Sequence, residues 1–426
     1  MIRKILLFVM LVGIGIFNVN AQSTWFPQTS GVESALYSVD FINQNNGIAV
    51  GDAGTIIRTT DGGENWQIIN SGVTDVLNSV SYIDENNIII VGNGGLILKS
   101  IDAGQTWAQK NVSGMTYDLL GLDMLPSGKG IAGGRAQTIL WTNDGGENWT
   151  ILRTDYWGGG FYAAHILNDN LAFVYGENSI MTHLIGKVMN GGDSLDFRDF
   201  YINYNGAMTE GIINDGYNFN EDSCVTVGAI FPGIAAITSN QSWEERYWNS
   251  SYILDAYYLQ GVDFIGPYGV AVGANYGRGT SLIVESTDFG QNWTEIPENY
   301  SKKASANRNV KLIENTGYIV GDGGKILKKT PEVGIPENSN KLGITISPNP
   351  AVTGATISFN NPANSNVSLN LYNATGQMAA KVYNGTLTAG MQKISLPVQN
   401  LNNGLYFITI YCEGHSYTQK IVIAQN

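Results

Sequence analysis

The sequence predicts an all-β chain: a seven-bladed β-propeller closed by an N-terminal strand, followed by a small immunoglobulin-like β-sandwich. Three observations support this fold class. An eight-residue element recurs at a regular interval, short apolar runs come in groups of four, and a segment with two prolines, PEVGIPENSNKL at 331–342, separates the repeats from a different C-terminal pattern. The composition agrees, since 52 glycines, 22 tyrosines and only 14% charged residues are typical of short strands joined by tight turns.

The recurring element has the form S/T-x-D-x-G-x-x-W. It occurs as TTDGGENW at 59–66, SIDAGQTW at 100–107, TNDGGENW at 142–149 and STDFGQNW at 286–293. The first four tryptophans of the pattern, at 25, 66, 107 and 149, are 41, 41 and 42 residues apart. Each interval holds four apolar runs of strand length, and four strands in about 40–45 residues are typical of one propeller blade.

The chain contains seven such units, starting near residues 35, 76, 117, 160, 213, 257 and 306, of which the fourth and fifth are degenerate. The last unit ends at KILKKTPEVG and lacks a strand that begins with tryptophan. At the other end of the domain, WFPQTSG at 25–31 matches WQIINSG at 66–72 in its Trp and Ser-Gly. We therefore expect the N-terminal segment to complete the last blade, so that residues 22–330 form a ring without open sheet edges.

The aspartates of the recurring element are expected to shape turns. An aspartate in a turn accepts hydrogen bonds from nearby backbone N–H groups, glycine allows positive φ, and tryptophan packs between sheets. A catalytic site needs one constellation and not four copies, so we assign no catalytic residue. The residues with this expected structural role are Asp61, Trp66, Asp102, Trp107, Asp144, Trp149, Asp288 and Trp293.

The turns at the opposite side of the blades are the expected binding face. Alignment on the recurring element places Asp52, Asn93, Arg135, Glu177 and Asp322 at one equivalent turn. Aromatic residues in the links between blades extend this candidate site, although they could instead pack within enlarged blades; they are Tyr156, Trp157 and Trp248. Two cysteines and three histidines form no CxxC or HExxH spacing, so we expect neither a metal nor a cofactor.

The recurring elements resemble the Asp-boxes of sialidases and other propeller proteins. With VGD-x-G-x-I ahead of the box, residues 22–330 look most like the photosystem II stability/assembly factor family of seven-bladed propellers, above all in units one to three, six and seven. In that family a basic patch engages a partner protein. The third-strand positions here are mixed in charge, so that patch does not carry over cleanly; they are Arg58, Lys99, Trp141, Glu285 and Lys328.

An enzymatic alternative remains open at this stage. A sialidase-like site would need an arginine triad and an Arg-Ile-Pro motif, and this motif is absent from the sequence. A xyloglucanase-like glycoside hydrolase would need two facing carboxylates, which Asp52, Glu177 and Asp322 could supply. We favour a non-enzymatic propeller that binds a protein or glycan.

The last segment, 343–426, has alternating apolar residues that predict a β-sandwich. It resembles the type A C-terminal sorting domain of the type IX secretion system of Bacteroidetes, with SPNP at 347–350, NATGQ at 373–377 and NGLY at 403–406. The resemblance implies contact with the secretion machinery and export across the outer membrane. The alternative is an ordinary immunoglobulin-like adhesion module. The motif residues are Pro348, Asn349, Pro350, Gly404, Tyr406 and Lys420.

The N-terminus and the overall charge agree with export. MIRKILLFVMLVGIGIFNVNA, residues 1–21, has the basic start, apolar run and small-residue end of a secretory signal peptide. A net charge of −13 argues against duplex nucleic acid as a partner, and no later run is long and apolar enough to span a membrane. We expect a monomer that passes through the periplasm to the cell surface or the medium.

Overall fold

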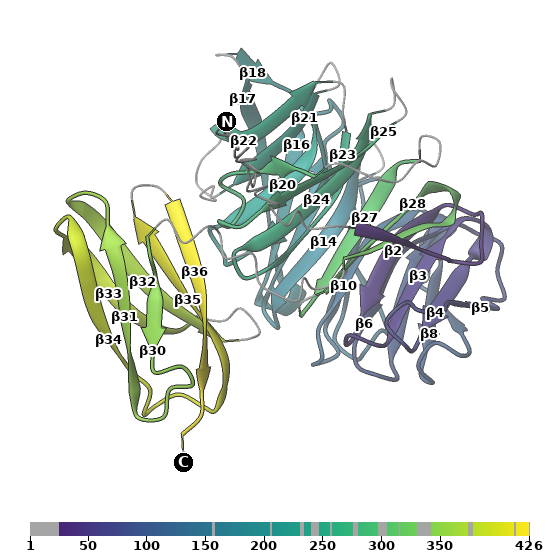
Figure 1. The fold of residues 1–426 in the computed structure, drawn as a ribbon. Coiled ribbons are helices and arrows are strands. Elements are labelled where there is room, and N and C mark those ends of the chain that lie inside the picture. Colours follow the sequence, from purple (N-terminus) through teal and green to yellow (C-terminus); the bar gives the residue numbers. More distant parts are fainter. Residues whose placement is uncertain are drawn as a thin grey trace, which may run out of the picture.

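A computed structural model describes residues 25–155, 158–204, 207–230, 234–239, 247–255, 258–275, 280–296, 305–314, 316–329, 342–373, 378–412 and 415–425. Apart from four three-residue 3₁₀ turns, its regular elements are β-strands, which confirms the all-β class (Figure 1). The signal peptide and nearly all of the expected linker 331–342 lie outside the described residues. No helix among the described residues is long and apolar enough to cross a membrane.

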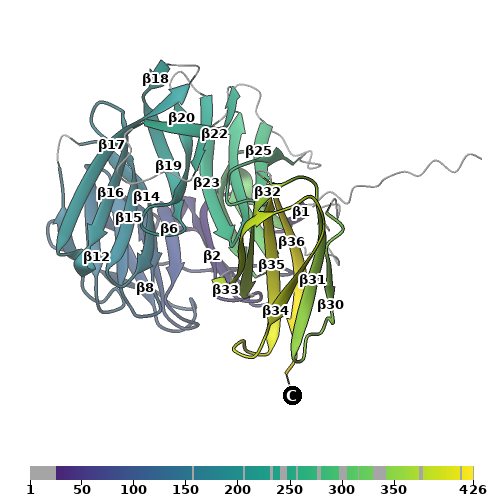
Figure 2. The same ribbon diagram turned by 90° about the vertical axis from the view of Figure 1, so that its left-hand side faces the viewer.

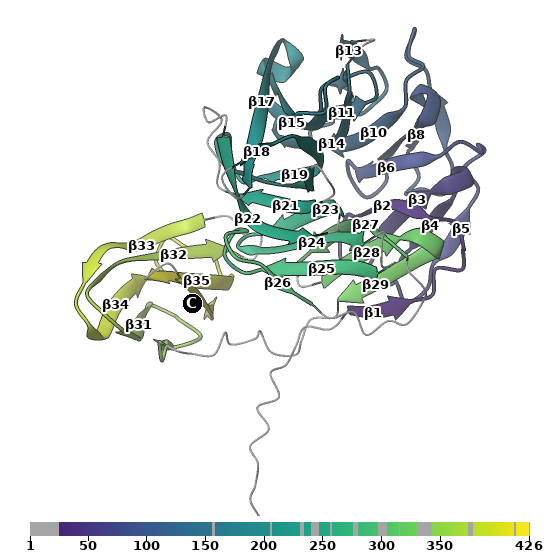
Figure 3. The same ribbon diagram turned by 90° about the horizontal axis from the view of Figure 1, so that it is seen from above.

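Four-stranded antiparallel sheets follow one another along the chain. The first contains β2 (Leu36–Phe41), β3 (Gly47–Gly51), β4 (Ile56–Thr59) and β5 (Gln67–Ile69). The second contains β6 (Leu77–Tyr82), β7 (Ile88–Gly92), β8 (Ile97–Ser100) and β9 (Ala108–Lys110). The third contains β10 (Leu119–Met124), β11 (Gly130–Gly134), β12 (Thr138–Thr142) and β13 (Thr150–Arg153). A later one contains β23 (Tyr258–Ile265), β24 (Tyr268–Asn275), β25 (Thr280–Ser286) and β26 (Thr294–Glu295). Figure 3 shows these sheets arranged around a common centre, as the blades of a propeller.

The degenerate region forms one larger sheet. Its strands are β14 (Gly160–Asn168), β15 (Leu171–Glu177), β16 (His183–Met189), β17 (Ser194–Tyr204), β18 (Ala207–Thr209), β19 (Gly211–Asn218), β20 (Cys224–Ile230), β21 (Ile234–Ser239) and β22 (Tyr247–Asp255). Two antiparallel four-strand units meet where β17 pairs with β22 in parallel, and β18 adds to β17. The irregular sequence of units four and five therefore corresponds to longer outer strands that join two neighbouring units (Figure 2).

The N-terminal strand completes the final sheet, as the Trp25 match predicted. This sheet has the order β1 (Trp25–Gln28), β29 (Lys325–Lys329), β28 (Thr316–Gly321) and β27 (Asn307–Ile313). Trp25 lies opposite Lys329 and is only 7% exposed, and its indole nitrogen donates to Glu285 Oε1 of the preceding sheet at 2.9 Å. The N-terminal strand therefore covers the edge of β29 and ties the two ends of the domain into one sheet.

A glycine at the end of each second strand allows the strands to approach closely. A Cβ atom built on Gly51 would lie 1.9 Å from the carbonyl oxygen of Ala35, which no real side chain tolerates. The same clash with a first-strand carbonyl, between 1.8 and 2.3 Å, arises at the equivalent glycines: Gly92, Gly134, Gly176, Gly228, Gly273 and Gly321. The repeated Val-Gly or Tyr-Gly of the sequence therefore has a steric cause.

Side-chain hydrogen bonds connect the innermost strands across sheet boundaries. Asp40 Oδ2 accepts from Tyr82 N at 2.8 Å, and this pattern is repeated from sheet to sheet around the channel. The further acceptor and donor pairs are Ser81 with Met124 N, Asp123 with Ile166 N, His165 Nδ1 with Asn218 N, Asp215 with Val262 N, and Asp263 with Leu312 N, at 2.7–3.2 Å. At the last step Lys311 Nζ lies 2.9 Å from Asp40 Oδ1 and closes the circuit.

We refer to the side chains of this circuit as the channel ring: Asp40, Ser81, Asp123, His165, Asp215, Asp263 and Lys311. Burial shifts the pKa values of several of these groups. It raises the pKa of Asp123 to about 6 and that of Asp215 to about 7, and it lowers the pKa of His165 to about 4. For Lys311 burial acts in the opposite sense, but the carboxylates of Asp40 and Asp263 outweigh it and raise the pKa of the ammonium group. The Lys311 side chain therefore stays a cation over the whole physiological range.

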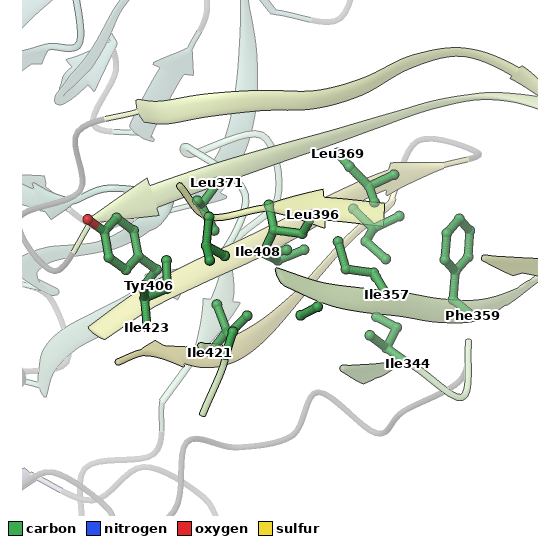
Figure 4. Packing of buried hydrophobic residues seen from close by; sticks show 14 of the residues in the cluster. Ile344, Ile357, Phe359, Leu369, Leu371, Leu396, Tyr406, Ile408, Ile421 and Ile423 are labelled. Atoms are coloured by element: carbon green, nitrogen blue, oxygen red, sulfur yellow. The ribbon is translucent and has the colours of Figure 1, made fainter. Parts of the chain in front are cut away.

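Two further sheets form the C-terminal sandwich. One contains β30 (Thr345–Ser347), β31 (Gly354–Asn361) and β34 (Gly390–Pro397); the other contains β33 (Met378–Leu387), β32 (Ser365–Asn373), β35 (Gly404–Cys412) and β36 (His415–Ile423). Their facing side chains form one buried cluster, in which Phe359, Leu369 and Ile408 are fully buried (Figure 4). Leu342, the last residue of the expected linker, packs into this cluster.

The closing strand leads to the first testable prediction. Trp25→Ala should lower the free energy of unfolding by about 3–5 kcal/mol, because it removes a buried indole from the junction between the two ends of the propeller. Phe26→Ala changes the adjacent residue of the same strand, whose side chain is 47% exposed, and should cost about 0.5 kcal/mol. Urea denaturation of both variants measures the difference, and equal losses would contradict the closure.

The channel ring leads to the second prediction. Lys311→Met leaves the Asp40 carboxylate without its cation. The ammonium side chain is 34% exposed to the channel, so we expect a loss of about 2 kcal/mol, below the ~3–5 kcal/mol of a fully buried pair. Lys328→Met is the control, because its partner Glu64 is 71% exposed and such pairs contribute about 0–1 kcal/mol. If both variants unfold at the same urea concentration, the Lys311–Asp40 pair does not hold the ring together.

Candidate functional site

The Asp-box loops satisfy their own polar groups. In the first box the Thr59 hydroxyl donates to Asp61 Oδ1 at 2.9 Å and accepts from Gly63 N at 2.8 Å, while Asp61 accepts from the backbone and side chain of Asn65 at 2.9 and 2.8 Å. The boxes at Asp102, Asp144 and Asp288 repeat this geometry. The side-chain hydrogen bond from Asn65 is the main cause that lowers the pKa of Asp61, and the bond from Thr106 lowers the pKa of Asp102 to about 2.

The box loops also lock neighbouring blades. A Cβ on Gly104 would lie 2.5 Å from Ile48 of the preceding sheet, and Tyr318 donates its hydroxyl to the carbonyl of Gly62 at 2.9 Å. The box tryptophans are partly buried: Trp66, Trp107 and Trp293 pack against three of the core clusters and Trp149 against a fourth. The hydrogen bonds of the box aspartates described above all lie within their own loops.

The opposite side opens into a central cavity of about 500 Å³. The innermost strands line it: β2, β6, β10, β14, β19, β23 and β27. Most of the polar side chains that face it come from matching positions on these strands, such as Tyr37, Asn78, Tyr162 and Arg308. These four residues precede the channel ring by three positions, so they lie one layer nearer to the turns between the second and third strands.

The predicted turn residues meet these cavity residues in pairs. The Asn78 amide donates to Asn93 Oδ1 at 2.8 Å. Tyr162 donates to Glu177 Oε1 at 2.6 Å, and Arg308 makes two contacts with Asp322, at 2.8 and 3.2 Å.

Tyr37 makes the corresponding contact with Asp52. Burial is the first cause that raises the pKa of Tyr37, and its hydrogen bond to Asp52 adds to it. Burial and the bond to Glu177 raise the pKa of Tyr162 in the same way. We refer to the residues of these pairs, together with Arg135, as the mouth ring: Tyr37, Asp52, Asn78, Asn93, Arg135, Tyr162, Glu177, Arg308 and Asp322.

Short turns present the acidic and amide members of the mouth ring. Asp52, Asn93 and Asp322 each begin a 3₁₀ turn: η1 (Asp52–Gly54), η2 (Asn93–Gly95) and η4 (Asp322–Gly324). The second residue of each turn is left-handed, with φ of 53° at Ala53, 66° at Gly94 and 67° at Gly323. Among the described residues one further turn of this kind, η3 (Asn190–Gly192), joins β16 to β17 and does not belong to this set.

Two arginines give the mouth ring its cationic groups. Arg135 donates to the Tyr162 hydroxyl at 3.2 Å and lies 5.3 Å from the ring centre, so it links two neighbouring blades. Arg308 lies 5.7 Å from the ring centre of Tyr37. Both arginines therefore contribute a positive charge next to an aromatic surface and a carboxylate, which is a mixed lining.

The remaining candidate positions are only partly described. Tyr156 and Trp157 lie outside the described residues. The backbone at Trp248 pairs with Ile202 in the parallel contact of β22 and β17, which places it where the two four-strand units of the large sheet meet and not on a cavity-lining strand. Sequence reasoning missed Tyr37, Asn78 and Arg308 as members of the binding face, whereas Tyr162 belongs to the aromatic link that the sequence already singles out. All four stand at the same point of the first strands and could have been found by aligning those strands.

The motif residues of the sandwich surround its last strand. Asn349 accepts from Val422 N at 2.9 Å and donates to the Lys420 carbonyl at 3.1 Å, so the SPNP segment is tied to β36. Tyr406 is 6% exposed and donates to the Asn402 carbonyl at 3.1 Å. Beside it, Gly404 begins β35 opposite Ile423.

Comparisons with known proteins match one segment of the propeller and the C-terminal domain. Residues 17–115 match the family described as photosynthesis system II assembly factor YCF48, and residues 345–424 match the secretion system C-terminal sorting domain. No curated protein matches the sequence. Among solved structures, YCF48 from Cyanidioschyzon merolae is 20% identical, with a TM-score of 0.56 over 73% of this chain and 99% of that one.

Three further structures share the fold at low identity. YCF48 bound to D1 peptide is 18% identical, with a TM-score of 0.56 over 72% of this chain and 96% of that one. PorZ of Porphyromonas gingivalis, described as an essential bacterial surface component of the type-IX secretion system, is 14% identical with a TM-score of 0.52 over 93% and 60%. The GH74 xyloglucanase from Xanthomonas campestris is 10% identical with a TM-score of 0.54 over 93% and 69%.

At these identities the solved structures establish the fold alone, while the two family matches agree with the motifs in the sequence. The chain is therefore a YCF48-like propeller, matched by that family's model at residues 17–115, followed by a C-terminal secretion-system sorting domain at 345–424.

Proposed function

We propose that this chain is an exported propeller whose mouth ring binds an extended peptide segment of a partner protein at the cell surface or in the medium. The observation that carries the proposal is the mouth ring itself, a polar lining in which carboxylates, amides and arginines surround a cavity of about 500 Å³. Such a lining offers donors and acceptors to peptide groups and salt-bridge partners to side chains of either sign.

Several observations support seven blades and a domain layout of 22–330, 331–342 and 343–426. The close-approach glycine recurs at Gly176 and Gly228, in the two halves of the large sheet, as it does in the other blades. Each half supplies one strand to the cavity, β14 and β19. The two-sheet sandwich with its single core supports an immunoglobulin-like fold for the last domain.

A peptide is favoured over a glycan for two reasons. The YCF48 structure that shares this fold is bound to a peptide, from D1. In addition, the aromatic groups of the mouth ring, Tyr37 and Tyr162, have their hydroxyls engaged by carboxylates and their rings near guanidinium groups. Sugar-binding sites depend on aromatic faces, and these two faces are already partly occupied.

The third prediction tests the mouth ring. Peptides selected from a random display library on the chain 22–426 should bind Arg308→Gln and Tyr162→Phe about tenfold more weakly, since a hydrogen bond to a charged group contributes about 1.5–3 kcal/mol. Lys110→Gln is the control. Lys110 lies on β9, the outer strand of its sheet, where it pairs with Glu147 and does not line the cavity. Calorimetric titration measures the affinities. Equal affinities for all four proteins would place peptide binding elsewhere.

A glycoside hydrolase remains the alternative function. Asp52, Glu177 and Asp322 carry the carboxylates that such an enzyme would use, but each of them already accepts a hydrogen bond or ion pair from Tyr37, Tyr162 or Arg308. A screen of the same chain against xyloglucan and sialylated glycans decides the matter. Turnover that disappears in Asp52→Asn, Glu177→Gln or Asp322→Asn would replace the binding function with hydrolysis.

The fourth prediction concerns export. In a host with a type IX secretion system, removal of 343–426 should keep the propeller in the periplasm, because the segment that matches the sorting-domain family is lost. Full-length chain with Met391→Ser, a substitution at a 65% exposed side chain of the same domain, should still reach the surface or medium. Immunoblots of cell fractions measure both. Normal delivery of the truncated chain would refute a sorting role.

A further inference from the structure

One Asp-box departs from the others at a single position. This position lies between the aspartate and the glycine of the D-x-G segment. It is occupied by Gly62, Ala103 and Gly145 in three boxes and by Phe289 in the fourth. All four have left-handed backbones, with φ of 69°, 60°, 69° and 60°. A bulky side chain is disfavoured at positive φ, so a phenylalanine here requires a compensating interaction.

The Phe289 ring ends a line of aromatic contacts. Its centre lies 5.4 Å from that of Phe219 in an edge-to-face arrangement, and Phe219 in turn lies 4.9 Å from Phe264. Phe264 contacts the box tryptophan, Trp293, at 5.8 Å. These contacts run from the core between two blades to the Asp-box side of β25 and β26, where Phe289 is half-buried.

The sorting domain supplies the partner on the other side. Along β32 the core residues are Leu369 and Leu371, so the alternating residue Tyr372 belongs to the outer face of its sheet, yet it is only 9% exposed. Thr409 lies on the same outer face, opposite Asn370, and is fully buried. An outer face that excludes water must be covered.

On the propeller, Phe289 lies next to Tyr372. The ring centres of Phe289 and Tyr372 are 6.3 Å apart, within the range of a stabilising aromatic pair. Figure 3 shows the sandwich, with β32 and β35, beside the part of the propeller that holds β22 and β26.

We propose that the propeller docks its own sorting domain on the Asp-box side through a Phe289–Tyr372 clasp. The clasp compensates for the left-handed phenylalanine and covers Tyr372 on the outer face of β32. Separation of the two domains would uncover Phe289 on the propeller, on the side opposite the mouth ring. The docking surface is thus distinct from the proposed binding site.

The fifth prediction uses the full chain 22–426 and hydroxyl-radical footprinting, which reports side-chain exposure. Phe289→Gly should raise the labelling of Tyr372 roughly fivefold, because loss of one aromatic pair raises the fraction of chains with separated domains by about that factor. Ala103→Gly is the matched control, because it makes the same change of backbone freedom in a box with no described contact to the sandwich. Its Tyr372 labelling should equal that of the unchanged chain.

Two further measurements keep the test decisive. Phe289→Gly should stay folded and unfold as cooperatively as Ala103→Gly, because glycine suits the left-handed position in both boxes. Tyr372→Ser, which changes the other side of the clasp, should raise the labelling of Phe289 by a similar factor. If Tyr372 is labelled as strongly in the unchanged chain as in Phe289→Gly, or if Tyr372→Ser leaves Phe289 unaffected, the domains are not docked through this pair.

Discussion

The circuit of hydrogen bonds between the innermost strands is the constraint on which the rest of the structure depends. Each sheet presents one side chain to the backbone of the next, and the Lys311–Asp40 pair joins the last sheet to the first. Because these bonds fix the register of every first strand against its neighbour, they also fix the layer above. Tyr37, Tyr162 and Arg308 stand three residues earlier on the same strands, so the geometry of the mouth ring follows from the channel ring.

The two sides of the propeller carry different kinds of polar contact. On the Asp-box side each carboxylate bonds groups of its own loop, as Asp61 does with Thr59 and Asn65. On the mouth side the contacts join different elements, as when Arg135 of one blade reaches Tyr162 of the next. A loop that satisfies itself can recur without change, whereas a ring built between elements can vary from blade to blade. This difference explains why the box sequence repeats while the mouth residues differ.

Much of the fold could be predicted from the sequence because its physical causes are local. The box turn needs Asp61, a glycine and a tryptophan at fixed spacing, and the missing strand could be inferred from the match at Trp25. The pairing of β17 with β22 could not, because it depends on the twist of two long outer strands that no local pattern encodes. The positions of Arg308 and Tyr37 could be found by aligning the first strands, but their contact could not, since they become neighbours only when the ring closes.

The sorting domain shows the same relation between motif and contact. Asn349 of the SPNP segment bonds the backbone of β36, and Asn403 of the NGLY segment accepts from Gln425 N at 2.7 Å, just after that strand. Two motifs far apart in the sequence therefore hold one terminal segment from both sides. These bonds use side chains at the end of the sandwich and leave the outer face of β32 unoccupied by motif residues. That face is the one where Tyr372 meets Phe289, so a single small domain can present its motif end while its sheet face rests on the propeller.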